Sequence, residues 1–223
     1  LNSLKQAKGK RILVWSEQGY GDTLQFCRYL PLVSDLAAKV TFSVQGGLKR
    51  LLDGQFEANV ISKSSPPNPT DFDFQIPLLS LPLLCASHTP CLPSETPYLK
   101  ADAALSAQWR ARLDLATDRP NIAIAFSGNP EQSEDVKRSM PLDALLPLLA
   151  VCRLHIVQKD IRPEDRTTLA AHPEIRDLSG DLEDFADTAA ILYHMDAVVS
   201  VCSAPAHLAG ALGRPLLLML AHA

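Results

Sequence analysis

Short apolar runs rich in β-branched residues alternate with amphipathic stretches along the first half of the chain. The apolar residues of 24–37 recur at helical spacing between two such runs. A strand, a helix and a strand joined by short connections form a βαβ unit, whose strands pair in parallel. We therefore predict strands at 11–15, 39–44, 58–62 and 72–77, and helices at 24–37, 46–54 and 78–86.

The second half repeats the same alternation. Residues 121–127 form an apolar run without a single charged residue, which is typical of a strand covered on both faces. We predict strands at 121–127, 153–159, 175–180, 196–201 and 214–220, and helices at 102–115, 141–151, 163–173, 182–195 and 204–213.

These patterns predict an α/β protein of two Rossmann-like, doubly wound parallel-sheet domains, 1–100 and 101–223, joined around residues 95–118. Ligands of such sheets bind beyond the carboxyl ends of the strands, and a cleft between two domains is the expected site. The chain does not begin with Met and ends in LLLMLAHA. We expect a piece of a longer protein, with the second domain incomplete at its C-terminus.

Composition and charge narrow the function. The chain has 223 residues, of which 47% are hydrophobic and 21% charged, and its net charge is −4. This balance is ordinary for a globular protein and gives no support to nucleic-acid or polybasic membrane binding. No run reaches the roughly 18 apolar residues of a transmembrane helix. Five cysteines without a disulfide framework predict free thiols and a cytoplasmic location.

Metal binding is not expected. Cys85, His88 and Cys91 lie close together in the sequence, but their spacing is not that of a zinc knuckle and no second pair of ligands exists. A Pro-rich loop of small residues explains them better.

The segment EQGYGDT, residues 17–23, follows the first predicted strand. Gly19 and Gly21 permit positive φ and close backbone approach, and the N–H groups of the next helix attract an anion. Asp22 is either a general base or the N-cap of a helix beginning near Thr23. Glu17 is either a second polar group of the site or a surface residue.

Polar residues also follow the strand at 121–127. Small residues and cations after a parallel strand suit a phosphate group, although a solvated loop with ordinary charges has the same composition. The candidates in this segment, 125–141, are Ser127, Gly128, Asn129, Lys137 and Arg138. Gln158 and Lys159 end the next strand and either contact a ligand or mark the edge of the sheet.

The third segment, residues 199–215, joins a strand to a helix rich in small residues. Such residues let the helix approach the sheet closely and direct its dipole at a ligand. Ser203 and Ala204 lie at the start of this helix, and His207 in its first turn. The alternatives are that Ser203 is only an N-cap and His207 a structural residue.

Taken together, three motifs carry a resemblance. EQGYGDTLQF with RYLPLV, then SGN with RSMPL, then VVSVCSAPAHLAGALGRP resemble the glycosyltransferase-type domain of bacterial tetratricopeptide-repeat proteins. That domain is similar to the ADP-heptose:lipopolysaccharide heptosyltransferases of GT-B fold. The resemblance covers roughly residues 9–220, and the first and last motifs are the most specific.

The resemblance implies roles for individual residues. Asp22 matches the family's proposed base, with Glu17, Gly19 and Gly21 in the loop beside the acceptor. Arg138 or Lys137 matches the basic residue that holds the donor diphosphate, and Ser203 and His207 match the last diphosphate-binding motif.

One position departs from the family's pattern. Cys202 stands where the family has aspartate, and Pro205 lies inside the motif. Loss of that carboxylate puts catalysis in question more than the fold, because the helix is positioned by packing.

The function implied is inverting, metal-independent transfer of a sugar from a nucleotide-diphosphate donor to a glycan, lipid or protein acceptor. The first domain would serve the acceptor and the second the donor, with no cofactor. Upstream repeats would bind protein partners. The alternatives are a degenerate, non-catalytic scaffold module and another GT-B enzyme such as an epimerase.

Overall fold

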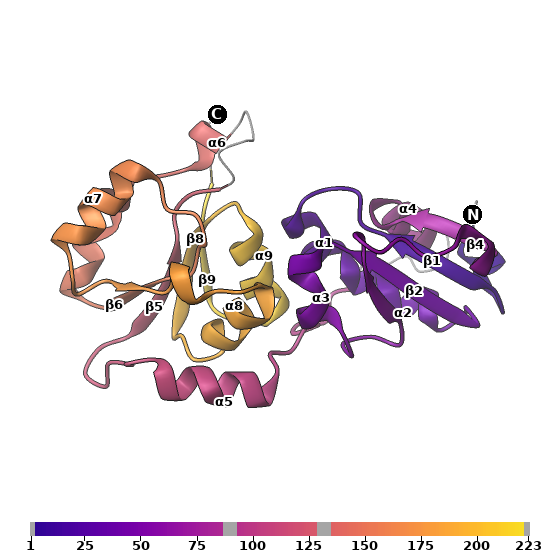
Figure 1. Ribbon diagram of the computed structural model, residues 1–223, viewed down its shortest axis with the longest axis horizontal. Coiled ribbons are helices and arrows are strands. Elements are labelled where there is room, and N and C mark those ends of the chain that lie inside the picture. Colours follow the sequence, from indigo (N-terminus) through magenta and orange to yellow (C-terminus); the bar gives the residue numbers. More distant parts are fainter. Residues whose placement is uncertain (1–2, 87–92, 129–134, 221–223) are drawn as a thin grey trace. The chain divides into compact units, whose positions relative to one another are not determined.

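The chain divides into two compact units, Leu1–Lys100 and Ala101–Ala223. The computed structural model describes residues 3–86, 93–128 and 135–220. Each unit is built on one parallel sheet, of four strands in the first unit and five in the second (Figure 1). The predicted α/β class with two parallel sheets is confirmed.

Unit 1 has the strand order β3-β2-β1-β4, with every pair parallel. Its elements follow the predicted order closely. They are η1 (Leu4–Ala7), β1 (Arg11–Trp15), α1 (Tyr20–Phe26), η2 (Cys27–Tyr29), α2 (Leu30–Ser34), β2 (Lys39–Val44), α3 (Gly46–Leu52), β3 (Asn59–Ser62), η3 (Pro69–Asp71), β4 (Phe74–Pro77), η4 (Leu78–Ser80) and α4 (Leu81–Ala86), where η denotes a 3-10 helix.

The first connection of unit 1 differs from the single helix predicted at 24–37. The helix starts earlier, at Tyr20, and is broken into α1, the 3-10 turn η2 and α2. Pro31 lies at the start of α2, where it has no N–H to donate to the preceding turn. The break therefore falls where the regular helical hydrogen bond cannot form.

Unit 2 has the strand order β7-β6-β5-β8-β9, again entirely parallel. The long 3-10 helix η5 contains Pro147, which cannot donate a hydrogen bond. The elements are α5 (Ala103–Arg112), β5 (Asn121–Ala125), α6 (Asp135–Arg138), η5 (Leu142–Ala150), β6 (Arg153–Ile156), α7 (Pro163–Ala171), β7 (Arg176–Asp177), η6 (Ser179–Asp181), α8 (Phe185–Leu192), β8 (Ala197–Val201), α9 (Ala204–Ala211) and β9 (Leu216–Met219).

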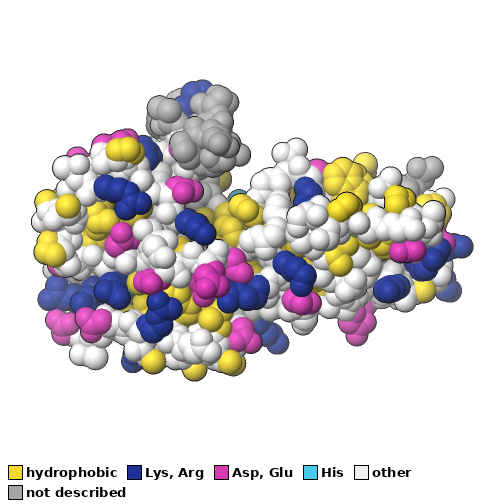
Figure 2. Space-filling view, viewed as in Figure 1, with side chains coloured by type: hydrophobic (Ala, Val, Ile, Leu, Met, Phe, Trp, Pro, Cys, Tyr) yellow, Lys and Arg dark blue, Asp and Glu magenta, His cyan; other side chains and the backbone are white. Residues whose placement is uncertain are grey.

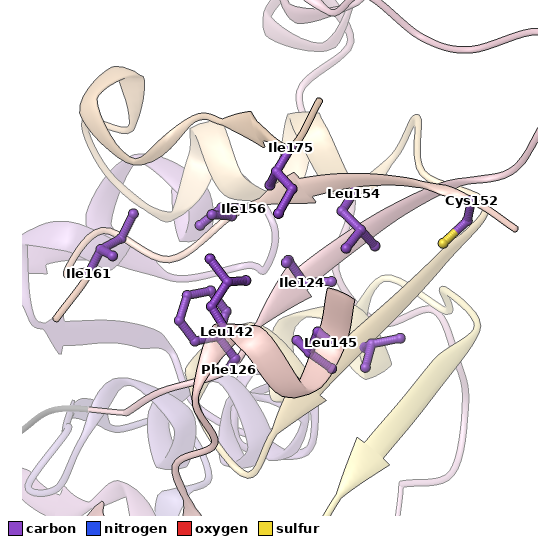
Figure 3. Close-up of a cluster of buried hydrophobic side chains, with 10 residues drawn as sticks. Ile124, Phe126, Leu142, Leu145, Cys152, Leu154, Ile156, Ile161 and Ile175 are labelled. Carbon is purple, nitrogen blue, oxygen red and sulfur yellow. The ribbon is translucent and has the colours of Figure 1, made fainter. Parts of the chain in front are cut away.

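The core of unit 2 follows from the alternation of large and small residues in β5. Ile124 and Phe126 are fully buried in a cluster with Leu142 and Leu145 of η5 and Ile156 of β6 (Figure 3). Alternate strand residues point to opposite faces, so the small residues Ala123 and Ala125 face the other side. Large side chains therefore fill one face of the sheet, and small ones admit close packing on the other.

A second group of helices in unit 2 packs through a buried polar contact. Helix α5 contacts α8, and α8 contacts α9. The indole Nε1 of Trp109 donates to Oδ1 of Asp187 at 2.8 Å, and Oδ2 of Asp187 accepts the backbone N–H of Glu183 at 3.1 Å. Both side chains are buried, so this aspartate satisfies a helix start and a tryptophan at once.

Charges of both signs are mixed on one face of the molecule. On the face seen in Figure 2, lysine and arginine side chains are interspersed with aspartate and glutamate. Within the described ranges, none of the helices combines the length and hydropathy needed to cross a bilayer.

His155 is a fully buried titratable group, the third residue of β6 and the neighbour of Ala123 in the sheet. Its Nε2 lies 3.2 Å from Oδ1 of Asn121, and its Nδ1 has no hydrogen-bond partner among the described residues. Burial, followed by the charges of Arg153 and Arg176, lowers its pKa from 6.5 to about 4, and Asp114 opposes this shift. Folding therefore holds the ring neutral.

This burial predicts a pH-dependent stability of unit 2. The unfolded state binds a proton near pH 6.5, and the folded state only near pH 4. The contribution of His155 to the free energy of unfolding is thus complete above pH 6.5. It falls by roughly 3 kcal/mol as the pH drops to about 4. Urea unfolding should be followed by Trp109 fluorescence in a Trp15→Phe chain. A His155→Gln variant with the same loss between pH 6.5 and 4 would contradict the assignment.

Candidate functional site

The candidate turn of unit 1 joins β1 to α1. Gly19 is the N-cap of α1, and Asp22 is its third residue. Oδ2 of Asp22 accepts the backbone N–H of Gly19 at 3.1 Å. The prediction that Asp22 caps a helix beginning near Thr23 is therefore wrong in position, although the carboxylate does close the first turn by reaching back. Within the described chain, Oδ1 of Asp22 accepts no hydrogen bond.

The glycines of this turn act differently from the prediction. Gly19 has φ −70°, Gly21 lies inside α1, and the described glycines with positive φ are Gly9, Gly54 and Gly213. The expectation of positive φ in EQGYGDT is thus not met. A Cβ on Gly19 would lie 3.4 Å from Oδ2 of Asp22, tight but not prohibitive. The missing side chain gives the carboxylate room to reach the backbone.

Gln45, the first residue after β2, holds this turn in place. Its Oε1 accepts from the hydroxyls of Ser16 at 3.1 Å and Thr23 at 3.0 Å, and its Nε2 donates to the carbonyl of Gln18 at 2.7 Å. Ser16 and Thr23 are buried. One amide side chain therefore fixes both ends of the turn that carries Asp22.

Two further polar groups lie at the same edge of this sheet. Nζ of Lys63, directly after β3, donates to the backbone carbonyl of Ser16. Oε2 of Glu17 is buried and has no hydrogen-bond partner in the ranges described. Glu17 is only partly exposed, so it is not the plain surface residue of the alternative interpretation. The carboxyl ends of β1, β2 and β3 thus gather a polar edge around Asp22.

In unit 2 the candidate residues follow β5 and β8, which are neighbours at the centre of the sheet. The chain leaves β5 toward β6 on one side and leaves β8 toward β9 on the other. This reversal of strand order is a topological switch point, the place where ligands of open α/β sheets bind. Both predicted donor segments of unit 2 lie at it.

Arg138 links the two loops at this switch point. Its Nε donates to Oδ1 of Asp135 at 3.0 Å, and its Nη1 donates to the backbone carbonyl of Cys202 at 3.1 Å. The Arg138 side chain is 23% exposed, so the guanidinium is largely held by protein while one part remains open to solvent. Lys137 is exposed. The structure thus separates two cations that the sequence alone leaves equivalent.

Ser127 and Gln158 form a buried pair beside this link. Oε1 of Gln158 accepts the backbone N–H groups of Phe126 at 2.7 Å and Ser127 at 3.1 Å, and its Nε2 donates to Oγ of Ser127 at 2.7 Å. Both side chains are buried. Gln158 therefore shapes the loop after β5 and does not mark an exposed edge. Lys159 is exposed, and its Nζ donates to the carbonyl of Glu183 at 3.3 Å.

Ser203 occupies the N-cap position of α9, but its hydroxyl makes no capping hydrogen bond. Its Oγ lies 3.3 Å from Oγ of Ser200 instead. Pro205 has no N–H, and no hydrogen-bond partner exists for the N–H of Ala204 in the described part of the chain. The first turn of α9 therefore keeps donor capacity, which suits an anion. His207 is partly buried in this turn.

Some predicted features cannot be placed. Asn129, together with His88 and Cys91, lies outside the described residues. Within residues 3–86, 93–128 and 135–220, no group of three His, Cys, Asp or Glu side chains could hold a metal ion. A hollow of about 300 Å³ lies in unit 1 beside Lys39 and Glu57, at the amino ends of β2 and β3. Because it is at the opposite edge of the sheet from Asp22, it is not part of the candidate site.

The described thiols differ in accessibility. Cys27, Cys85 and Cys152 are buried, and Cys202 is partly exposed. Burial raises the pKa of the first three thiols, that of Cys85 to about 11. Cys202 is therefore a natural chemical probe of the switch point, because the buried thiols are unreactive.

Sequence reasoning missed Gln45, Asp135 and Ser139. Gln45 carries a usable signal, because it directly follows a strand that neighbours β1 in a parallel sheet. Asp135 and Ser139 carry none, since they belong to a polar loop in which several residues could equally have formed the contacts.

The chain is similar to known proteins in sequence and in fold. Residues 152–220 match the family model described as glycosyltransferase family 9 (heptosyltransferase). Protein FlbA of Caulobacter vibrioides is 23% identical over 238 residues, and the match covers 95% of this chain. The chain spans only 39% of the length of that relative.

Two solved structures show the same fold at low identity. The glycosyl transferase family 9 structure from Veillonella parvula superposes with TM-score 0.69 at 11% identity, over 97% of this chain and 83% of that one. The ADP-heptose lps heptosyltransferase II of E. coli gives TM-score 0.67 at 15% identity, over 93% and 84%. The chain therefore has the fold of family 9 glycosyltransferases, and the segment that matches the family model, residues 152–220, includes Cys202, Ser203 and His207.

Proposed function

We propose that this chain is a glycosyltransferase domain whose second unit binds the diphosphate of a nucleotide-sugar donor at the switch point between β5 and β8. The observation that carries the proposal is the position of Arg138, whose guanidinium links the loops after these two strands. Solved structures of the same fold include a heptosyltransferase named for an ADP-linked heptose. The sugar transferred here is proposed only as a class, a hexose or heptose.

The physical chemistry of the switch point supports a diphosphate. Arg138 contributes a cation, and the first turn of α9 contributes the N–H of Ala204 and the positive end of a helix of eight residues. As the bond to the sugar breaks, negative charge develops on the departing diphosphate. The same groups would stabilise this charge, which favours departure of the nucleoside diphosphate. Because these groups supply positive potential, we propose that transfer needs no metal; activity that stops when EDTA is added would contradict this part.

We assign the acceptor to unit 1 and the role of general base to Asp22. Inversion at the sugar carbon needs a base that takes the proton of the attacking hydroxyl. Asp22 has one carboxylate oxygen bonded to Gly19 and the other without a partner among the described residues. Gln45 and Lys63 hold the surrounding turn, so the base would be fixed before the acceptor, a glycan, lipid or protein, binds.

The proposal also covers the longer protein, its partners and its compartment. The resemblance to domains of tetratricopeptide-repeat proteins implies that a longer chain carries repeats that bind protein partners. The described cysteines are free thiols, which suits a reducing cytoplasm. A non-catalytic module is not favoured. The aspartate expected at position 202 to order this loop is absent, but Arg138 holds the loop through the backbone carbonyl of Cys202.

The donor site can be tested by ligand-dependent stability. A nucleoside diphosphate present at 100 times its dissociation constant should stabilise the chain by about 2.7 kcal/mol, a rise of roughly 5–10 °C in Tm. Thermal unfolding should be measured with ADP, GDP, UDP and their sugar conjugates. Arg138→Ala should abolish the shift, whereas Arg110→Ala, which removes an exposed charge from α5 of the same unit, should leave it unchanged. An equal shift in Arg138→Ala would remove Arg138 from the site.

The base can be tested without disturbing the turn. Asp22→Asn keeps an oxygen that can accept the N–H of Gly19 but cannot take a proton from the acceptor. Transfer should fall by about 10²–10⁴-fold while donor affinity stays the same. Activity should be followed with the donor found in the stability screen. Retained transfer together with lower thermal stability would show that Asp22 only closes the first turn of α1.

A further inference from the structure

The most deeply buried charge at the switch point belongs to Asp135, which is 5% exposed. Its carboxylate is bonded through both oxygens. Oδ1 accepts from Nε of Arg138 at 3.0 Å, and Oδ2 accepts from the hydroxyl of Ser139 at 2.9 Å. A carboxylate removed from water in this way is tolerated only with a cation and hydrogen bonds to satisfy it.

Asp135 lies in the middle of a continuous path of hydrogen bonds. The N–H of Gly128, after β5, donates to Oγ of Ser139 at 3.1 Å, and that hydroxyl donates to Asp135. Arg138 donates to Asp135 on one side and to the carbonyl of Cys202, after β8, on the other. The path therefore joins the two loops of the proposed donor site through one carboxylate.

The absence of a side chain at position 128 makes this arrangement possible. A Cβ on Gly128 would lie 2.2 Å from Oδ1 of Asp135 and 2.3 Å from Nη2 of Arg138. No real Cβ approaches other atoms that closely, so the ion pair rests directly on the backbone after β5. The glycine predicted as a phosphate contact thus has a second requirement, imposed by the Asp135–Arg138 pair.

We propose that Asp135 is a positioning residue for the donor diphosphate, acting through Arg138; this rests on the proposed donor site. An arginine side chain has many rotamers, and fixing it costs binding free energy if it is fixed only when the ligand arrives. The bond from Nε to Asp135 fixes the guanidinium plane in advance, and the bond to Cys202 fixes its direction. The donor then meets a cation whose orientation between the two loops is already fixed.

The competing interpretation is an ordinary structural ion pair, and unit 2 contains a matched control for it. Arg162 and Asp165 have the same spacing of three residues, with Nε and Oδ2 4.0 Å apart, and Asp165 is 2% exposed. Oδ1 of Asp165 accepts the backbone N–H of Leu142 at the start of η5, and in the described ranges no hydrogen bond or ion pair joins Asp165 to Gly128, Ser139 or Cys202. Asp165→Asn therefore perturbs an equally buried carboxylate outside the site.

The test combines binding with a chemical probe of the loops. Inorganic pyrophosphate is titrated calorimetrically into the full chain, which avoids any choice of nucleobase. The rate at which N-ethylmaleimide modifies Cys202 is mapped by peptide mass spectrometry. Both are measured for the unsubstituted chain, Asp135→Asn, Arg138→Ala, the double variant and Asp165→Asn.

We expect Asp135→Asn to weaken pyrophosphate binding about tenfold, because hydrogen bonds between charged groups are worth about one such factor. Arg138→Ala should weaken it at least as much, and the double variant no further than Arg138→Ala alone. Cys202 should react several-fold faster in Asp135→Asn and Arg138→Ala, but not in Asp165→Asn. Arg138→Lys tests the same link if Asp135→Asn does not fold, since lysine cannot form the two fixed bonds and should also weaken binding.

Three results would overturn the inference. They are unchanged binding in Asp135→Asn, additive losses in the double variant, and an equal loss in Asp165→Asn. Failure of the unsubstituted chain to bind pyrophosphate or any nucleoside diphosphate would instead refute the proposed donor site. In that case the Cys202 rate still decides whether Asp135 holds the two loops together: a faster rate in Asp135→Asn supports the link, and an unchanged rate refutes it.

Discussion

All strands of each sheet run parallel, and this constraint determines where chemistry can occur in the molecule. Parallel strands bring their carboxyl ends to a single edge of the sheet. There, each strand is followed by a loop whose backbone N–H and C=O groups need hydrogen-bond partners. In both units a glutamine after the neighbouring strand meets this need. Gln45 fixes the loop after β1, and Gln158 fixes the loop after β5. The same arrangement, a central strand whose loop is held by the strand beside it, therefore occurs twice.

The second unit adds a charge to this arrangement. Its switch point lies between β5 and β8, and Arg138 spans the loops of both strands while Asp135 neutralises and orients it. At Cys202, where the family's pattern has aspartate, the group that Arg138 contacts is the backbone carbonyl. The loop is ordered through its main chain, so it does not depend on the identity of that side chain.

Much of the fold can be predicted from the sequence because the alternation of apolar strands and amphipathic helices is regular. The strand β5 shows this well. Its uncharged sequence IAIAF predicts a central strand, and the alternation of large and small residues predicts different packing on the two faces. What the pattern cannot give is the exact course of the chain near proline and glycine. Pro31 divides the first helix. Gly19 has an ordinary negative φ in a turn that Asp22 closes locally and that Gln45 holds from the end of the neighbouring strand.

The candidate site shows the same division. Residues at strand ends can be found from the sequence, since parallel topology places them at one edge. The partners of these residues cannot be found from the sequence. Asp135, Arg138 and Ser139 lie in one short polar segment, and which of them pair depends on how closely the folded segment packs against Gly128 and Cys202. Selecting Arg138 over Lys137 requires the structure.

Hydrogen exchange is the sharpest test of whether the donor binds at the β5–β8 switch point. Backbone amide exchange should be measured by mass spectrometry with and without the nucleoside diphosphate that most stabilises the chain. We predict slower exchange in the peptides that contain Phe126–Gly128, Ser139 and Ser203–His207, with unit 1 unchanged. Protection confined to residues 1–100, or bound ligand with no protection at these loops, would contradict it.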